Sequence, residues 1–320
     1  MSNYKLLNIN LQLFAEMNTQ VTSQSSLSDE MKVFYSDYLI DNAVPKLVHD
    51  QFGQKHPIPK NGGKTIEFRK YSPLPKLLTP LTEGVTPDGQ SLTVSTVEAT
   101  VAQYGGYITL SDMLLMTAID NNMVQATKLL GAQAGASLDT ITREVLNGGT
   151  NVVYAGGVDS RSALSANLTV DDIKKAVRAL KNQNAEKIGD SFVAIIHPDV
   201  TYDLTNDPAW QAVKDYDPKD WYEGEIGKIA GVRFVETTEA KIFEGGVYST
   251  LILGDNAYGV TEIEGGGLEH IVKQLGSAGT SDALNQRATV GWKATKVAER
   301  LVEQFMVRIE SKSTFAGAAN

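Results

Sequence analysis

Histidine is the residue type that most often carries metal-binding or acid-base chemistry, and the chain of 320 residues contains only four. They are His49, His56, His197 and His270. No two stand three or four residues apart, the spacing at which a helix lets two imidazoles share a metal ion. We expect a structural role for His49 and His56, which span a predicted loop. The sequence therefore predicts no metal site and no bound cofactor.

A hydrolase active site around His197 and Asp199 is one alternative that the sequence leaves open. Both residues come at the end of a predicted buried strand, where an acidic side chain is typical of the N-terminus of a following helix. The patterns GxSxG, GxxxxGK[S/T] and GxGxxG, which would mark a nucleophile or a phosphate site, do not occur at a suitable place. We therefore expect no catalytic residue and no enzyme, and the hydrolase is the weaker alternative.

Two tryptophans, Trp210 and Trp221, flank the acidic and aromatic segment PAWQAVKDYDPKDWYEGE. Aromatic side chains occur both over hydrophobic cores and at protein interfaces. Two interpretations therefore stay open: the tryptophans cover the core of their own domain, or they contact a neighbouring copy of the chain.

The composition narrows the classes of function further. The net charge is −9 and the isoelectric point is about 5.1, so the chain lacks the basic excess typical of sequence-specific nucleic-acid binding. The absence of cysteine excludes disulfides, thiolate metal sites and a cysteine nucleophile, and it fits a reducing compartment. No run of about 18 apolar residues occurs, so we expect no transmembrane helix and no membrane partner.

Alternating apolar and polar residues predict a long two-stranded ribbon, with strands at Lys64–Tyr71 and Leu92–Leu110. The segment between them, Ser72–Ser91, has 20 residues and no helix pattern, a length that argues for a functional projection. Charged residues sum to +3 over Lys64–Lys76 and to −3 over Leu77–Leu110. A ribbon of this kind is marginal alone in water, so we expect it to lie on another surface.

The remaining sequence alternates between helix and strand patterns. Apolar residues at helical spacing predict a long helix over Asn121–Asn147 and another from its N-cap, Thr169, to about Asn184. A further helix is expected from Ser28, after a polar connector. The other predicted elements are a strand at Ser191–His197, a short helix from Pro198 to about Thr205, further strands up to residue 272, and two strands within Arg287–Lys312.

Four long and unusual strings in the chain are VPKLVHDQFGQKHPIPKNGGKTIEFRKYSPLPK, LTPLTEGVTPDG, QYGGYITLSD and DTITREVLNGGTNVVYAGG. Together with the order of the elements, they resemble the tailed-bacteriophage major capsid proteins of the Hong Kong 97-type fold, and in particular the coat-protein family typified by phage N-four. The likeness runs from about Met31 to Ser313. It implies an α+β fold with an N-terminal arm (1–60), an extended β-ribbon loop (61–110), a peripheral domain (111–189 and 273–320) with a spine helix (121–147), and an axial domain (190–272).

The resemblance implies a structural function that needs no catalysis. Many copies would self-assemble into hexamers and pentamers of an icosahedral head that encloses double-stranded DNA, with scaffold and portal proteins as further partners. The protein would assemble in the host bacterial cytoplasm and reside in the virion. An encapsulin-like shell that holds cargo enzymes has the same fold and stays open as an alternative.

The resemblance also indicates which residues of neighbouring copies would contact one another. We expect contacts between subunits at the tip of the extended loop and in the arm, through Lys76, Leu77, Leu78, Leu81, Glu83 and Asp88 and through Leu11, Leu13 and Phe14. Trp210 and Trp221 are candidate contacts within a capsomer. Some shells of this fold cross-link a loop lysine to an asparagine of a neighbour. Lys70 or Lys76 and Asn285 are available for such a bond, but no motif connects them.

Overall fold

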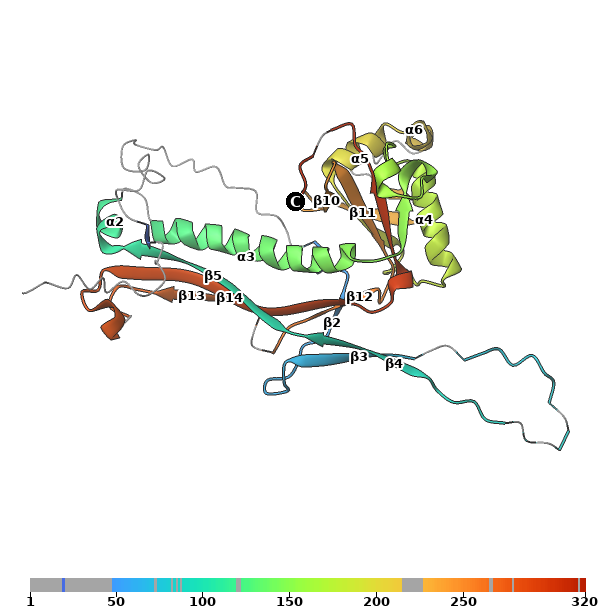
Figure 1. Cartoon of the computed structure of the whole chain (residues 1–320), viewed down its shortest axis with the longest axis horizontal. Helices are drawn as coiled ribbons and strands as arrows, with labels where there is room; N and C mark the ends of the chain where they lie inside the picture. Colours follow the sequence, from blue (N-terminus) through green and yellow to red (C-terminus); the bar gives the residue numbers. More distant parts are fainter. Residues whose placement is uncertain are drawn as a thin grey trace, which may run out of the picture. The chain divides into compact units, whose positions relative to one another are not determined.

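A computed structural model describes most of the chain (Figure 1). The chain divides into two compact units. Unit 1 comprises residues 1–42, 105–134 and 268–293, and unit 2 comprises residues 43–104, 135–267 and 294–320. The helix expected from Ser28 lies outside the described residues. The residues described are 19–20, 48–71, 74–81, 83–84, 86, 88–118, 122–214, 227–264, 267–277, 279–315 and 317–320.

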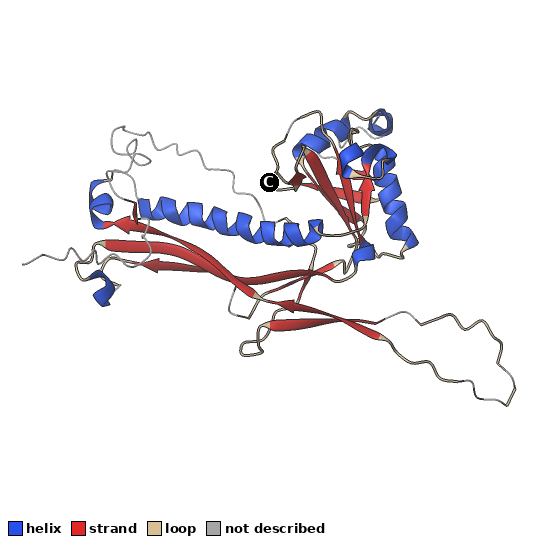
Figure 2. Cartoon of the chain, viewed as in Figure 1, coloured by secondary structure: helices blue, strands red, loops and turns tan. Residues whose placement is uncertain are grey.

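A seven-stranded sheet forms the centre of unit 2 (Figure 2). Its strands are β6 Val152–Tyr154, β7 Phe192–Ile196, β8 Lys228–Ile229, β9 Val232–Glu236, β10 Ile242–Phe243, β11 Val247–Leu253 and β15 Met306–Ser311. Their order is β6-β15-β11-β7-β9-β8, with β10 beside β11. The sequences FVAII of β7 and VYSTLIL of β11 are buried at every residue, which is typical of strands covered on both faces.

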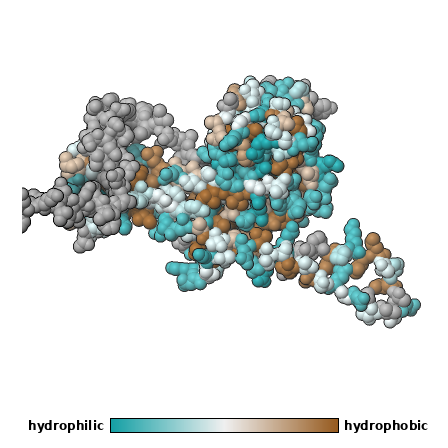
Figure 3. Space-filling model, in the orientation of Figure 1, coloured by the Kyte–Doolittle hydropathy of each residue, from teal (hydrophilic) through white to brown (hydrophobic). Residues whose placement is uncertain are grey.

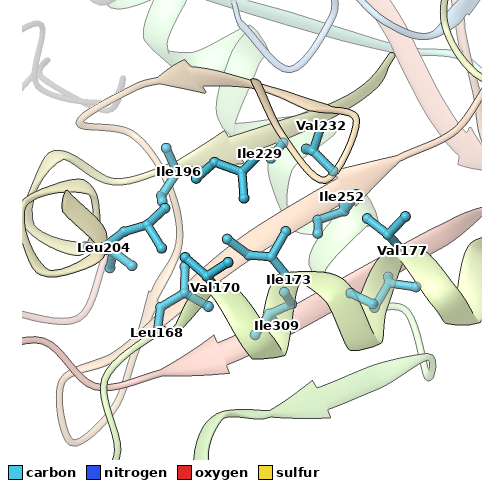
Figure 4. Close-up of a cluster of buried hydrophobic side chains, with 14 of the residues drawn as sticks. Leu168, Val170, Ile173, Val177, Ile196, Leu204, Ile229, Val232, Ile252 and Ile309 are labelled. Carbon is cyan, nitrogen blue, oxygen red and sulfur yellow. The ribbon is translucent and has the colours of Figure 1, made fainter. Parts of the chain in front are cut away.

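Helix α4, Val170–Asn182, packs against this sheet at β15 and β6. The hydroxyl of Thr169 caps the helix by accepting a hydrogen bond from the amide of Asp172. Ile173 and Val177 share one helix face and lie in a buried cluster with strand residues (Figure 4). Each such side chain contributes about 1.5–3 kcal/mol when it is fully buried. The predicted helix, its cap and its apolar face are confirmed.

The C-terminal strand β15 lies within the seven-stranded sheet, between β6 and β11. It pairs antiparallel with β11, from Tyr248 opposite Ser311 to Leu253 opposite Met306. We expected both terminal strands to return to the peripheral domain, and this assignment stays a prediction. Hydrogen bonding joins β15 both to β11, from the segment expected in the axial domain, and to β6, from the segment expected in the peripheral domain. An apolar pattern predicts that a strand is buried, but it does not predict which sheet the strand joins.

A two-stranded ribbon also belongs to unit 2. Strand β3, Thr65–Tyr71, pairs antiparallel with β4, Val94–Thr100, without a break in register. The first strand of the predicted ribbon is confirmed. The second, Leu92–Leu110, is divided at the buried Val101, and only β4 pairs with β3. The ribbon is therefore shorter than the sequence indicates, and the chain beyond Val101 enters a different sheet.

The base of the ribbon packs on two further strands of unit 2. Strand β12, Tyr258–Thr261, pairs antiparallel with the end of β14, Arg287–Arg300, and parallel with β2, Gln54–Lys55. A Cβ atom on Gly259 would lie 2.9 Å from the ring of Phe68. Only glycine therefore lets the ribbon approach β12 so closely.

Unit 1 is built on the pairing of β5, Ala102–Ser111, with β14. A Cβ atom on Gly105 would lie 2.7 Å from the carbonyl oxygen of Trp292, so a glycine is required where these strands meet. Strand β13, Glu269–Lys273, pairs with β14, and the two-residue strand β1, Thr19–Gln20, pairs with β5.

The long helix predicted at Asn121–Asn147 is confirmed as α3, Asn122–Asn147. None of the helices in the described part of the chain has both the length and the apolar character that a membrane crossing requires. The remaining elements are α2 Asp112–Thr117, α5 Pro198–Thr205, α6 Pro208–Lys214 and single turns of 3-10 helix at Ala155–Gly157, Arg161–Ala163, Gly279–Asp282 and Glu303–Phe305.

Candidate functional site

The segment that joins β3 to β4 leaves large apolar side chains in contact with solvent. Leu77, Leu78 and Leu81 are 79%, 85% and 76% exposed. The apolar residues stand out along this segment where it continues from the ribbon (Figure 3). Single exposed leucines are ordinary on a protein surface, but a cluster of them indicates an interaction site. The structure thus places these three residues outside the core of their own chain.

The same segment has no regular secondary structure among its described residues, 74–81, 83–84, 86 and 88–93. Pro75 and Pro80 cannot donate to a strand ladder, which keeps the segment from uncontrolled strand pairing. The predicted charged contact residues Lys76, Glu83 and Asp88 are exposed in it as well. All six predicted loop-tip residues are therefore available to a partner. That they contact one stays a prediction.

A buried polar cluster in unit 2 holds the chain just before the ribbon. His49 is fully buried, and its Nδ1 lies 2.6 Å from Oδ2 of Asp139 in α3. The backbone amide of His49 donates to the other oxygen of the same carboxylate over 2.8 Å. The hydroxyl of Tyr258 donates to the carbonyl oxygen of His49, and burial raises the pKa of this tyrosine well above its usual range. The contacts of His49 are structural.

A largely buried ion pair lies beside that histidine. Nζ of Lys296 in β14 contacts the carboxylate of Asp50 and donates to the carbonyl oxygen of Leu138 over 2.8 Å. The hydroxyl of Thr142 donates to Asp50 over 2.5 Å. Sequence reasoning missed this cluster, because its members are about 90 to 250 residues apart in the chain. No group of three or more histidine, aspartate or glutamate side chains is arranged to hold a metal ion in the part of the chain that the structure describes.

His197 and Asp199 form the N-terminal cap of α5. Nδ1 of His197 accepts the amide hydrogen of Asp199 over 3.1 Å, and burial lowers the pKa of the imidazole. The hydroxyl of Tyr248 donates to the Asp199 carboxylate over 2.6 Å. Burial and this hydrogen bond raise the pKa of Tyr248 to about 12, so it acts as a hydrogen-bond donor. Each group thus has a structural partner, and the arrangement does not favour the hydrolase alternative.

The tryptophans and the arm residues were also predicted to contact other copies. Trp210 is only 6% exposed and lies in the hydrophobic core cluster of unit 2. This position favours the interpretation that Trp210 covers the core of its own domain over a contact with a neighbouring copy. Trp221 and the arm residues Leu11, Leu13 and Phe14 lie outside the described residues.

The residues considered for a covalent cross-link, Lys70, Lys76 and Asn285, are all exposed. The cross-link stays a prediction. A denaturing gel of assembled particles checks it, because bands above the 34.6 kDa chain would support a covalent bond and a single band at that mass would contradict it.

Comparisons with known proteins bear on the fold and the family of the chain. A family model described as phage capsid protein matches residues 93–302. A search of curated proteins found no match. Similar solved structures include the capsid of the cyanophage P-SCSP1u, with a TM-score of 0.65 and 13% identity, covering 90% of this chain and 95% of that chain. The capsid of Ralstonia phage GP4 has a TM-score of 0.65 and 13% identity, covering 99% of this chain and 100% of that chain.

The capsid asymmetric unit of the cyanophage Pam1 is similar as well, with a TM-score of 0.63 and 15% identity over 99% of this chain and 100% of that chain. At these identities the structural matches concern the fold, and they confirm the predicted α+β capsid fold of the Hong Kong 97 type. The family model spans well over half of the sequence and assigns a structural function in the virion. The chain therefore belongs to the phage capsid protein family.

Proposed function

We propose that copies of this capsid protein assemble into pentamers and hexamers of an icosahedral head that encloses double-stranded DNA, and that the loop between β3 and β4 of each copy lies on a neighbouring copy. The exposure of Leu77, Leu78 and Leu81 carries this proposal. A protein that remained alone in solution would gain nothing from three solvated leucines on one segment. The family match favours a phage head over an encapsulin-like compartment.

The energetics support a shell built from many modest contacts. Full burial of one leucine contributes about 1.5–3 kcal/mol. Two proteins lose translational and rotational freedom when they associate, at a cost of about 4–15 kcal/mol. Burial of three leucines contributes less than the upper end of this range. One loop contact alone is therefore weak. In a ring or shell every copy gives and receives such a contact, so the sum becomes strong through multivalency.

The other parts of the proposal concern partners and place. Scaffold and portal proteins would guide assembly in the host bacterial cytoplasm, and the protein would have no enzymatic activity. The net charge of −9 supports a wall that confines DNA without binding its phosphates tightly, since tight contacts would hinder packaging and release. The domain assignment by resemblance, with an arm, a peripheral domain and an axial domain, belongs to the same proposal.

Electron microscopy of the purified, overexpressed protein tests the proposal. We expect closed shells, tubes or separate capsomers, and analytical ultracentrifugation of the same sample should show species much heavier than the 34.6 kDa chain. A stable monomer at high concentration, even with scaffold protein present, would contradict it.

A further inference from the structure

A groove of about 640 Å³ opens in unit 2 at the base of the ribbon. Ile66, Phe68 and Val97 line it from the ribbon, and all three are half-buried. Leu301 and Val302, which follow the end of β14, line it as well. The groove therefore offers apolar surface that its own subunit covers only in part, at a size typical of binding pockets.

A cationic side chain also lines this groove. Lys70 shares one face of β3 with Phe68, because side chains alternate along a strand, whereas Arg69 shares the opposite face with Glu67, 3.4 Å away in a largely exposed pair. His56 lines the groove as well, with its ring centroid 6.0 Å from that of Phe68. Lys70 therefore remains available to an incoming carboxylate.

The loop between β3 and β4 carries the complementary groups. Leu77, Leu78 and Leu81 are apolar and exposed, and Glu83 and Asp88 follow them with negative charges. The leucines do not fill the groove of their own chain, since all three are at least 76% exposed. Loop and groove are thus two separate and complementary surfaces on one subunit.

We propose that the groove at the base of the ribbon receives the loop of the next copy, with loop leucines against Phe68 and Leu301 and a loop carboxylate near Lys70. This inference rests on the proposed function and names the surface that receives the loop. An interface between two different patches of identical chains is heterologous, and it produces a closed ring when the rotation between copies closes. The pairing of loop and groove therefore supplies a physical reason for pentamers and hexamers.

Cysteine cross-linking tests the pairing directly, because the chain has no cysteine of its own. The variant Leu78→Cys with His56→Cys carries one thiol on the loop and one in the groove. Assembled shells of this variant are treated with a short bismaleimide and run on a denaturing gel. Every copy both gives and receives a contact, so we expect a ladder of multiples of the chain mass that ends at five and six copies.

Two controls separate this geometry from nonspecific cross-linking. Leu78→Cys with Lys181→Cys places the second thiol at an exposed position of α4 in the same unit, and we expect it to stay monomeric. A mixture of chains carrying only Leu78→Cys and chains carrying only His56→Cys should give dimers without a ladder. Shells in which the loop and groove thiols do not cross-link, or in which the Lys181→Cys control gives the same ladder, would overturn the pairing.

Charge exchange provides a second test that needs no cross-linker. Lys70→Glu should weaken assembly, and adding Glu83→Lys should restore it, since opposite charges then face each other again. Restoration supports the pairing, and a further loss on adding the second substitution would contradict it. If the unaltered protein itself forms no shells or capsomers, the proposed function fails, and that outcome is distinct from failure of the groove.

Discussion

Two regions of this chain use the same apolar residues for opposite purposes. In the seven-stranded sheet and its helices, side chains such as Leu204 are completely buried. In the loop between β3 and β4, Leu78 is 85% exposed. Both regions contain leucine, so the residue type alone does not show which side chains are buried within the subunit. The apolar residues of this subunit thus divide into a part that is buried and folds the subunit and a part that stays exposed, which the proposed function assigns to contacts between subunits.

The folding core of unit 2 contains the ion pair of Asp50 and Lys296, and we expect its loss to lower the free energy of unfolding more than any other change. Lys296→Met leaves the carboxylate of Asp50, whose side chain is 18% exposed, without its counter-ion in a partly buried site, so the free energy of unfolding should fall by up to about 3–5 kcal/mol. Urea denaturation measures this loss. Lys293→Met is the matched control on the same strand, since its pair with Glu269 is about half exposed and should be worth about 0–1 kcal/mol. Equal effects of the two substitutions would contradict the assignment of Asp50 and Lys296 to the folding core.

The same substitution, leucine to alanine, should have different effects on stability in the two regions. Leu204→Ala creates a cavity in the core and should lower the free energy of unfolding by about 2–5 kcal/mol. Leu78→Ala removes the same atoms from an exposed site and should change the free energy of unfolding by less than about 0.5 kcal/mol. Urea denaturation of both variants checks these values. In contrast, Leu78→Ala should reduce the yield of assembled particles, and a normal yield would place the leucine outside any interface.

A smaller effect concerns pH and the cap of α5. Burial lowers the pKa of His197 below its ordinary value of 6.5, so the unfolded chain binds a proton more readily than the folded one. The contribution of this group is fully present above pH 6.5 and is lost as the pH falls from there through the lower folded pKa. His197→Asn keeps a capping side chain but cannot titrate. Thermal unfolding of the variant should therefore depend less on pH below about 6.5 than that of the unaltered protein, and an identical dependence would contradict this role.

Local signals explain what the sequence could predict. The cap at Thr169, the proline that opens α5 and the apolar run of β7 act within a few residues, and the predicted elements match the structure closely. The exposed leucines were also predictable, because Ser72–Ser91 combines prolines with apolar residues that no regular element could bury.

Long-range pairing explains what the sequence could not predict. Nothing near Val101 indicates that β4 pairs with β3 while the next strand pairs with β14, because both strands have the same alternating pattern. The contact of His49 with Asp139 joins residues 90 positions apart. Likewise, the apolar pattern of β15 predicts burial but not its neighbour β11. The groove at the ribbon base depends on the same distant pairings, so no single segment contains its signal.

Deletion of Pro73–Gly89 tests most directly whether the loop serves assembly and not folding. The deletion leaves Ser72 and Gln90–Thr93 to join Tyr71 to Val94, five residues, which is within the usual range for hairpin loops. We expect a circular dichroism spectrum and a thermal unfolding midpoint close to those of the full chain, and electron microscopy should show no closed shells. Closed shells of normal appearance, or a chain that no longer folds, would contradict the division between the folding core and the assembly loop.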